Sequence, residues 1–146
     1  MIRSERGAST VEFALVIPIV LVVMLTAFDF TRALLAYSAI NHGSREGVRY
    51  AVLHPDAKEK DIEDEVRRRT PLSADDLSVT VSFKKADEAS WDEWKPASVT
   101  TTPDTVTVRV DVSYPWQAAS ALVAGFFAAT SQSLELTSTS FMDMRR

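Results

Sequence analysis

The feature that most constrains this chain is an apolar run from Phe13 to Phe28 that contains no charged residue. Read as one helix over residues 8–28, the segment is about 21 residues long and spans roughly 31 Å at 1.5 Å per residue. The hydrocarbon core of a bilayer is about 30 Å thick, so the sequence predicts a transmembrane helix. Pro18 is tolerated there, because neighbouring segments compensate for its missing N–H.

One carboxylate, Glu12, stands at the start of this run. A carboxylate at the centre of a bilayer costs about 2.5–3.5 kcal/mol on insertion scales, and less toward the ends. We therefore expect Glu12 to have a function. The short N-terminus with Arg3 and Arg6 favours a cytoplasmic N-terminus. A cleaved secretory signal starts similarly, but the residues after Phe28 match its cleavage pattern poorly, and an uncleaved signal anchor is the stronger alternative.

Composition excludes several classes of function. The 146-residue chain has a net charge of −4, which argues against nucleic-acid binding. It contains no cysteine, so disulfides, thiolate metal sites and a cysteine nucleophile are excluded. No G-x-S-x-G motif or glycine-rich phosphate loop occurs, and His42 and His54 lack metal-ligand spacing. We expect no enzyme activity, no cofactor and no metal site; a membrane-tethered hydrolase has only scattered carboxylates in its favour.

The helical pattern continues beyond Phe28 as an amphipathic helix over residues 29–54, which Pro55 ends. Gly43 and Gly47 in it are spaced to allow close packing against a neighbour or a local bend. A second helix is predicted in "KDIEDEVRRRT", with Ile62 and Val66 on its buried side. Its acidic first turns and basic last turn suit the helix macrodipole.

Three segments alternate apolar and polar residues and predict strands over residues 77–83, 105–116 and 133–144, the first two pairing as an antiparallel hairpin. Their connection carries Trp91 and Trp94, which are candidate contacts with a partner or the lipid surface, or alternatively cover the sheet. The apolar stretch over 117–130 is too short to span a membrane and is predicted to be a helix or loop packed on the sheet. The fold class is α+β: a long N-terminal transmembrane helix leading into a small head with an antiparallel sheet of about three strands.

The stretch "RGASTVEFALVIPIVLVVML" resembles the N-terminus of type IV prepilin-like precursors. It is most similar to TadE-like proteins, the minor pilins or pseudopilins of the Tad (tight adherence, Flp-type) pilus system. "SREGVRYAVL" and the "VSYPW … LTSTSFM" ending resemble the same family's downstream pattern. The resemblance implies a pilin-like fold and a single-pass protein of the bacterial inner (cytoplasmic) membrane, with a periplasmic or extracytoplasmic head.

The resemblance also implies roles for single residues. Such precursors are cut after a glycine by an inner-membrane aspartyl peptidase, and Gly7 and Ala8 stand at that position. Glu12 and Phe13 would then be the fifth and sixth residues of the mature chain. In related pilins this glutamate neutralises the N-terminal amine of the neighbouring subunit. Many precursors have Tyr where this chain has Phe13.

The domains implied are a leader (1–7), a transmembrane helix (8–28), its amphipathic continuation (29–54) and an extracytoplasmic α+β head (55–146). Flp-type pilins proper are short and nearly all helix, so the head argues for a minor component or assembly factor. The implied partners are a prepilin peptidase, other Tad pilins or pseudopilins, the inner-membrane assembly platform and the lipid bilayer. The alternative is a generic signal-anchored extracytoplasmic binding domain, which needs neither Gly7 nor Glu12.

Overall fold

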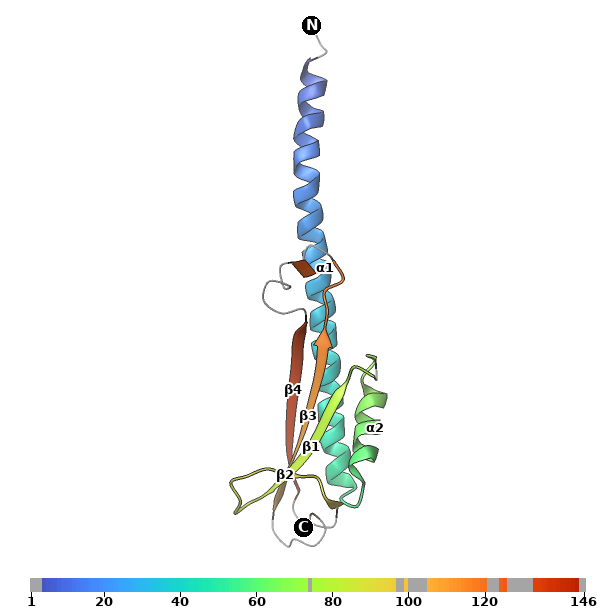
Figure 1. The fold of residues 1–146 in the computed structure, drawn as a ribbon, viewed down its shortest axis with the longest axis vertical. Coiled ribbons are helices and arrows are strands. Elements are labelled where there is room, and N and C mark those ends of the chain that lie inside the picture. Colours follow the sequence, from blue (N-terminus) through green and yellow to red (C-terminus); the bar gives the residue numbers. More distant parts are fainter. Residues whose placement is uncertain are drawn as a thin grey trace. The chain divides into compact units, whose positions relative to one another are not determined.

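The computed structural model describes residues 4–73, 75–96, 99, 105–120, 124–125 and 133–144. Its elements are α1 (Ser4–Leu53), α2 (Glu59–Arg69), β1 (Ser78–Lys85), β2 (Asp92–Glu93), β3 (Val106–Trp116) and β4 (Leu134–Met144) (Figure 1). The chain divides into two compact units, which are described separately below. The first comprises residues 1–34 and 117–133, and the second comprises residues 35–116 and 134–146.

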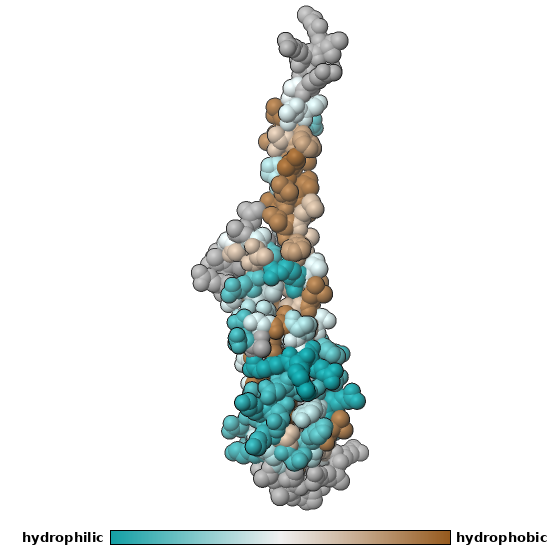
Figure 2. All heavy atoms as spheres, turned by 90° about the vertical axis from the view of Figure 1, so that its right-hand side faces the viewer, coloured by the Kyte–Doolittle hydropathy of each residue, from teal (hydrophilic) through white to brown (hydrophobic). Residues whose placement is uncertain are grey.

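The first unit contains the N-terminal part of α1. An 18-residue window of this helix has a mean hydropathy of 2.6, and none of its side chains is buried. Figure 2 shows hydrophobic side chains covering this part of the helix. Pro18 lies inside it, as the sequence allowed. By length and composition, this is a helix capable of crossing a membrane.

The second unit is built on a four-stranded antiparallel sheet with the order β2-β1-β3-β4. Its three long strands are those predicted from the alternating pattern, and β1 and β3 pair as predicted. The strand count is corrected by β2, which pairs with β1 only through Ser82–Glu93 and Phe83–Asp92. A two-residue strand has no detectable alternation and could not be predicted from periodicity.

One face of this sheet is buried under α1 and α2. Alternate residues of β3 point into the core, with Val106, Val108, Val110 and Val112 all buried. The helices contribute buried aliphatic side chains to the same cluster: Ile40, Val48 and Ala51 from α1, and Ile62 and Val66 from α2. The other face carries mostly polar side chains, which is the usual division in an antiparallel sheet with one solvated side.

Two glycines let α1 and α2 approach closely. A Cβ added to Gly47 would overlap with Cγ2 of Val66 and lie 3.4 Å from Cγ1 of Val110. A Cβ added to Gly43 would overlap with Oγ1 of Thr70 and lie 3.4 Å from Val66. Of the two roles predicted for this pair, the structure shows close packing.

A cluster of hydroxyl groups joins α1 to the inner face of β4. Ser44 is fully buried, and its Oγ lies 3.0 Å from Oγ of Ser138 and 2.8 Å from Oγ of Ser140. Ser138 also donates to Oδ1 of Asn41 at 3.3 Å. Because these groups satisfy one another, the polar inner face of β4 can be buried without unpaired hydroxyls.

Helix boundaries follow local signals. α1 ends at Leu53, just before His54 and Pro55, as predicted. The carboxylate of Asp61 accepts a 3.0 Å hydrogen bond from the N–H of Lys58 and caps the start of α2. At the other end of α2, the hydroxyl of Thr70 donates to the carbonyl of Val66 at 2.8 Å.

Candidate functional site

The N-terminal motif identified in the sequence lies on α1. Gly7 is exposed, and a Cβ placed there would meet no atom within 4 Å. Ala8 lies in the helix, although its side chain is outside the description. Glu12 and Phe13 are exposed, with Phe13 accessible over 64% of its surface. Within the part of the chain that the structure describes, Glu12 has no hydrogen-bond or ion-pair partner.

The surface around this motif consists of apolar side chains that no described residue covers. The large exposed ones in the predicted transmembrane part of α1 are Val11, Phe13, Leu15, Val16, Ile17, Ile19, Val20, Leu21, Val22, Val23, Met24, Leu25 and Phe28. They lie on all sides of the helix, a pattern typical of a helix surrounded by lipid or by other helices. Among the described residues, no counter-charge lies beside the carboxylate at the start of this surface.

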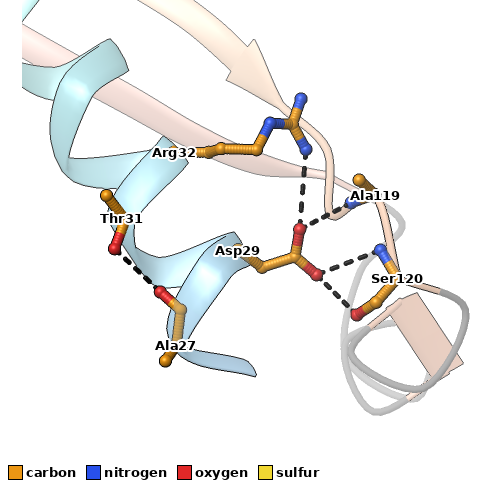
Figure 3. A network of polar contacts seen from close by, with 6 residues as sticks. All are labelled: Ala27, Asp29, Thr31, Arg32, Ala119 and Ser120. Atoms are coloured by element: carbon orange, nitrogen blue, oxygen red, sulfur yellow. Dashed lines mark hydrogen bonds and ion pairs between the residues drawn. The ribbon is translucent and has the colours of Figure 1, made fainter. Parts of the chain in front are cut away.

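A second polar site of the first unit was missed by the sequence reasoning. Asp29, the first charged residue after the apolar run, is only 1% exposed. Its Oδ1 accepts a 3.0 Å hydrogen bond from the N–H of Ala119, and its Oδ2 accepts one of 3.0 Å from the N–H of Ser120 (Figure 3). The hydroxyl of Ser120 donates to the same Oδ2 at 2.5 Å. The carboxylate thus holds the start of the connection between β3 and β4.

Electrostatics keep this carboxylate ionised. The hydroxyl of Ser120 is the main cause that lowers the pKa of Asp29 below its ordinary value, and the two backbone N–H groups and Arg32 act in the same direction against desolvation. Nη1 of Arg32 lies 3.5 Å from Oδ1, and the Arg32 side chain is 43% exposed. The carbonyl of Ser120 in turn accepts a hydrogen bond from the N–H of Ala124 at 2.9 Å.

The segment over 117–130 was predicted to pack on the sheet as a helix or loop. Its described residues, 117–120 and 124–125, include the two that bind Asp29 of α1. Its other residues lie outside the description. No local pattern could have indicated this contact, because Asp29 and Ser120 are 91 residues apart.

The two tryptophans of the β1–β3 connection have different surroundings. Trp94 is 3% exposed, packs edge-on against Phe83, and donates from Nε1 to the carbonyl of Ala57 at 2.9 Å. Of the roles left open for Trp94, it has the packing one. Trp91 is half-buried on the polar face of the sheet, its ring centroid 5.7 Å from that of Phe141. Trp91 remains a candidate partner contact.

The histidines and acidic residues were also considered as ligands. Among the described residues, no group of three or more His, Asp or Glu side chains is arranged to hold a metal ion. The ring of His54 stacks on Tyr50 at 4.3 Å, and its Nδ1 lies 3.1 Å from the carbonyl of Tyr50. These contacts with Tyr50 give His54 a structural role directly after the end of α1.

The fold and the N-terminal motif together define a class: a protein with a membrane-anchor-type apolar helix continuous with a small α+β head. Residues 7–49 match the model of the family described as TadE-like protein. The matched segment lies within α1 and includes Gly7, Glu12, Asp29 and Gly47, and the match agrees with the resemblance seen in the sequence. A search among curated proteins and a search among solved structures each gave no significant match.

Proposed function

We propose that this protein is a membrane-anchored pseudopilin or minor pilin that takes part in building a Tad pilus. The observation that carries the proposal is the apolar surface of α1 with Glu12 at its start, whose carboxylate has no partner among the described residues, within the segment that matches the TadE-like family. In this proposal residues 8–28 cross the bacterial inner membrane. The N-terminus is cytoplasmic and the head is extracytoplasmic.

Maturation is the first step of the proposal. A prepilin-type peptidase cuts between Gly7 and Ala8, on the cytoplasmic side of the membrane. The open space around Gly7 supports this assignment, because nothing in the described chain blocks access to it. Cleavage leaves a new ammonium group on Ala8, four residues before Glu12 on the same helix.

Pairing between subunits is the second step. The ammonium of Ala8 in one subunit and the carboxylate of Glu12 in the next attract strongly in an environment of low dielectric constant. Each offsets the desolvation of the other, and a subunit in the wrong register leaves both charges uncompensated. Removing one member of a buried pair typically costs about 3–5 kcal/mol, although the pair adds little net stability. Glu12 therefore sets register, with Phe13 packing beside it.

The remaining partners follow from this location. The lipid bilayer surrounds the apolar part of α1 before assembly, and other Tad pilins or pseudopilins replace it afterwards. The inner-membrane assembly platform is the complex on which this exchange takes place. The head over 55–146 makes the protein suited to a minor component or an assembly factor, and Trp91 is a candidate contact on its exposed sheet face.

Intact mass with N-terminal sequencing, measured on the protein extracted from its own cell membranes, tests the maturation step. We expect a chain that begins at Ala8. A chain that begins at Met1 would contradict cleavage and favour the alternative function, a signal-anchored extracytoplasmic binding domain. A Gly7→Leu variant is the matched control, because a bulky residue there should leave the chain uncut.

Replacement of Glu12 tests the pairing step. Glu12→Ala should leave membrane insertion unchanged but lower co-purification with other pilin subunits by at least tenfold, since it removes one member of the proposed buried pair. Glu12→Gln, which keeps the size of the side chain, should have the same effect. Glu135→Ala, an equal loss of charge on the exposed face of β4, should have none. Equal co-purification of all three variants would refute the pairing.

A further inference from the structure

The polar site around Asp29 has no part in the pairing of Glu12. We propose that Asp29 holds Ala119 and Ser120, at the start of the β3–β4 connection, at the point where α1 leaves the membrane, so that the described residues of this connection (117–120 and 124–125) rest against the lipid headgroup region. The proposal rests on the insertion of residues 8–28 described above. The ligand is the bilayer interface, recognised by an uncharged and largely apolar segment.

The position of Asp29 along α1 sets the depth of this contact relative to the membrane. Phe28 is the last residue of the apolar run, and Asp29 follows it directly. Charged residues that flank a transmembrane helix lie at the membrane–water interface, and long basic side chains such as Arg32 extend toward the headgroups. The 3.0 Å hydrogen bonds from Ala119 and Ser120 to Asp29 therefore place these two residues at the same level (Figure 3).

The carboxylate is suited to a place where water is scarce. A buried charge is costly unless it is paired and hydrogen-bonded. Asp29 accepts hydrogen bonds from two backbone N–H groups and from the hydroxyl of Ser120, and Arg32 is its counter-ion. Charge-assisted hydrogen bonds of this kind are strong and directional. Asp29 is therefore an anchor for the connection.

The composition of the β3–β4 connection suits the membrane interface. Residues 117–133 contain no charged side chain, and their apolar members include Leu122, Val123, Phe126 and Phe127. These residues form one compact unit with residues 1–34, which contain the apolar part of α1. Gly125 is exposed, and a Cβ there would meet no atom within 4 Å. An uncharged segment in the same compact unit as a lipid-facing helix gains stability by entering the interface.

Single-cysteine labelling tests this placement on the full chain. The protein has no cysteine, so each variant carries one NBD fluorophore. Gly125→Cys probes the connection, Val20→Cys the middle of the apolar helix, and Thr137→Cys the polar face of the sheet. Each labelled protein is reconstituted into phosphatidylcholine–phosphatidylglycerol vesicles that contain lipids spin-labelled either at the headgroup or in the middle of the acyl chain.

We expect headgroup-labelled lipid to quench the fluorophore at position 125 at least twice as strongly as that at position 137, and mid-chain labels to quench position 20. Equal quenching at positions 125 and 137, with position 20 quenched, would overturn the lipid contact and leave helix insertion standing. An unquenched but blue-shifted fluorophore at position 125 would show that protein covers the segment, which also overturns it. Absence of quenching at position 20 would overturn insertion itself, and the inference with it.

The anchoring role of Asp29 is tested in the Gly125→Cys background. Asp29→Ala should reduce quenching at position 125 to the level of position 137, because the N–H groups of Ala119 and Ser120 lose their acceptor. Asp64→Ala, the same change on the exposed side of α2, is the control. Unchanged quenching in the Asp29→Ala variant would remove Asp29 from the role. The three tryptophans all lie in the second unit, so an unchanged emission spectrum shows that the head is still folded.

Discussion

Residues 9–28 and residues 40–51 belong to the same helix, α1, but differ in what surrounds their side chains. In the first stretch apolar side chains are exposed on all sides of the helix. In the second, Ile40, Gly43, Ser44, Gly47 and Val48 are buried against the sheet and α2. The second stretch is stabilised within the chain, whereas the first requires lipid or other helices.

The largest expected effect comes from the close approach at Gly47. Gly47→Ala places a Cβ against the buried Val66, and overpacking of this kind costs about 1–3 kcal/mol. Alanine favours the helix by about 1 kcal/mol over glycine, which leaves a net cost of about 0–2 kcal/mol. Because the added Cβ would overlap directly with Cγ2 of Val66, we expect a value near the upper end of this range. Denaturant unfolding of the full chain in micelles, followed by tryptophan fluorescence, measures it in the second unit alone.

Gly7→Ala is the matched control for Gly47→Ala. It makes the same substitution in the same helix where the added Cβ meets nothing within 4 Å. The free energy of unfolding of the second unit should change by less than about 0.5 kcal/mol. If both variants unfolded at the same denaturant concentration, the contact between Gly47 and Val66 would have no importance for stability.

The hydroxyl cluster gives the next effect. Ser44→Ala removes the hydrogen-bond partner of Ser138 and Ser140, while Ser138 keeps its bond to Asn41. A buried hydroxyl that loses its partner is penalised by about 1–3 kcal/mol, so we expect the free energy of unfolding to fall by about 1 kcal/mol. The same unfolding measurement detects it. Thr31→Ala, which removes an exposed hydroxyl bonded only to the carbonyl of Ala27, should be neutral within about 0.5 kcal/mol. Equal losses in both would contradict a specific role for the buried cluster.

The smallest effect on the head is expected at Pro18. Pro18→Ala restores a backbone donor, and alanine is about 3 kcal/mol more favourable than proline inside a helix. Amide hydrogen exchange around residue 18 should therefore slow in micelles, while the fluorescence-monitored unfolding of the second unit stays unchanged. A shift of that unfolding by more than about 0.5 kcal/mol would show that the two stretches of α1 are not independent.

Periodicity in the sequence predicted much of this fold. The apolar run, the amphipathic continuation to Leu53, α2 with Ile62 and Val66 buried, and the three long strands all follow from spacing alone. The Gly43–Gly47 spacing also predicted a close contact, although not its partner. These features are local, so a single sequence contains the signal for them.

The features that were missed depend on contacts between distant residues. Asp29 and Ser120 are 91 residues apart, and Ser44 and Ser138 are 94 apart. For Trp94 the sequence left a partner contact and packing on the sheet both open, and the hydrogen bond to Ala57 and the packing against Phe83 decide for packing. Of the site residues, Glu12 was singled out by its place at the start of the apolar run, whereas Gly7, Ala8 and Phe13 came from the family resemblance. The roles of all four remain predictions.

The hydroxyl cluster between Ser44 and β4 also has a consequence for the speed of folding. Contacts between residues this far apart raise contact order and slow the search for the native state. If α1 enters the membrane early, the face of α1 that packs on the sheet stays uncovered until β4 has been translocated and has paired with β3 in the correct register. During that interval β3 is an edge strand with unpaired backbone groups, which attract other chains. Under the proposed export, intermediates in which β4 has not yet paired would expose this edge until β4 closes the sheet.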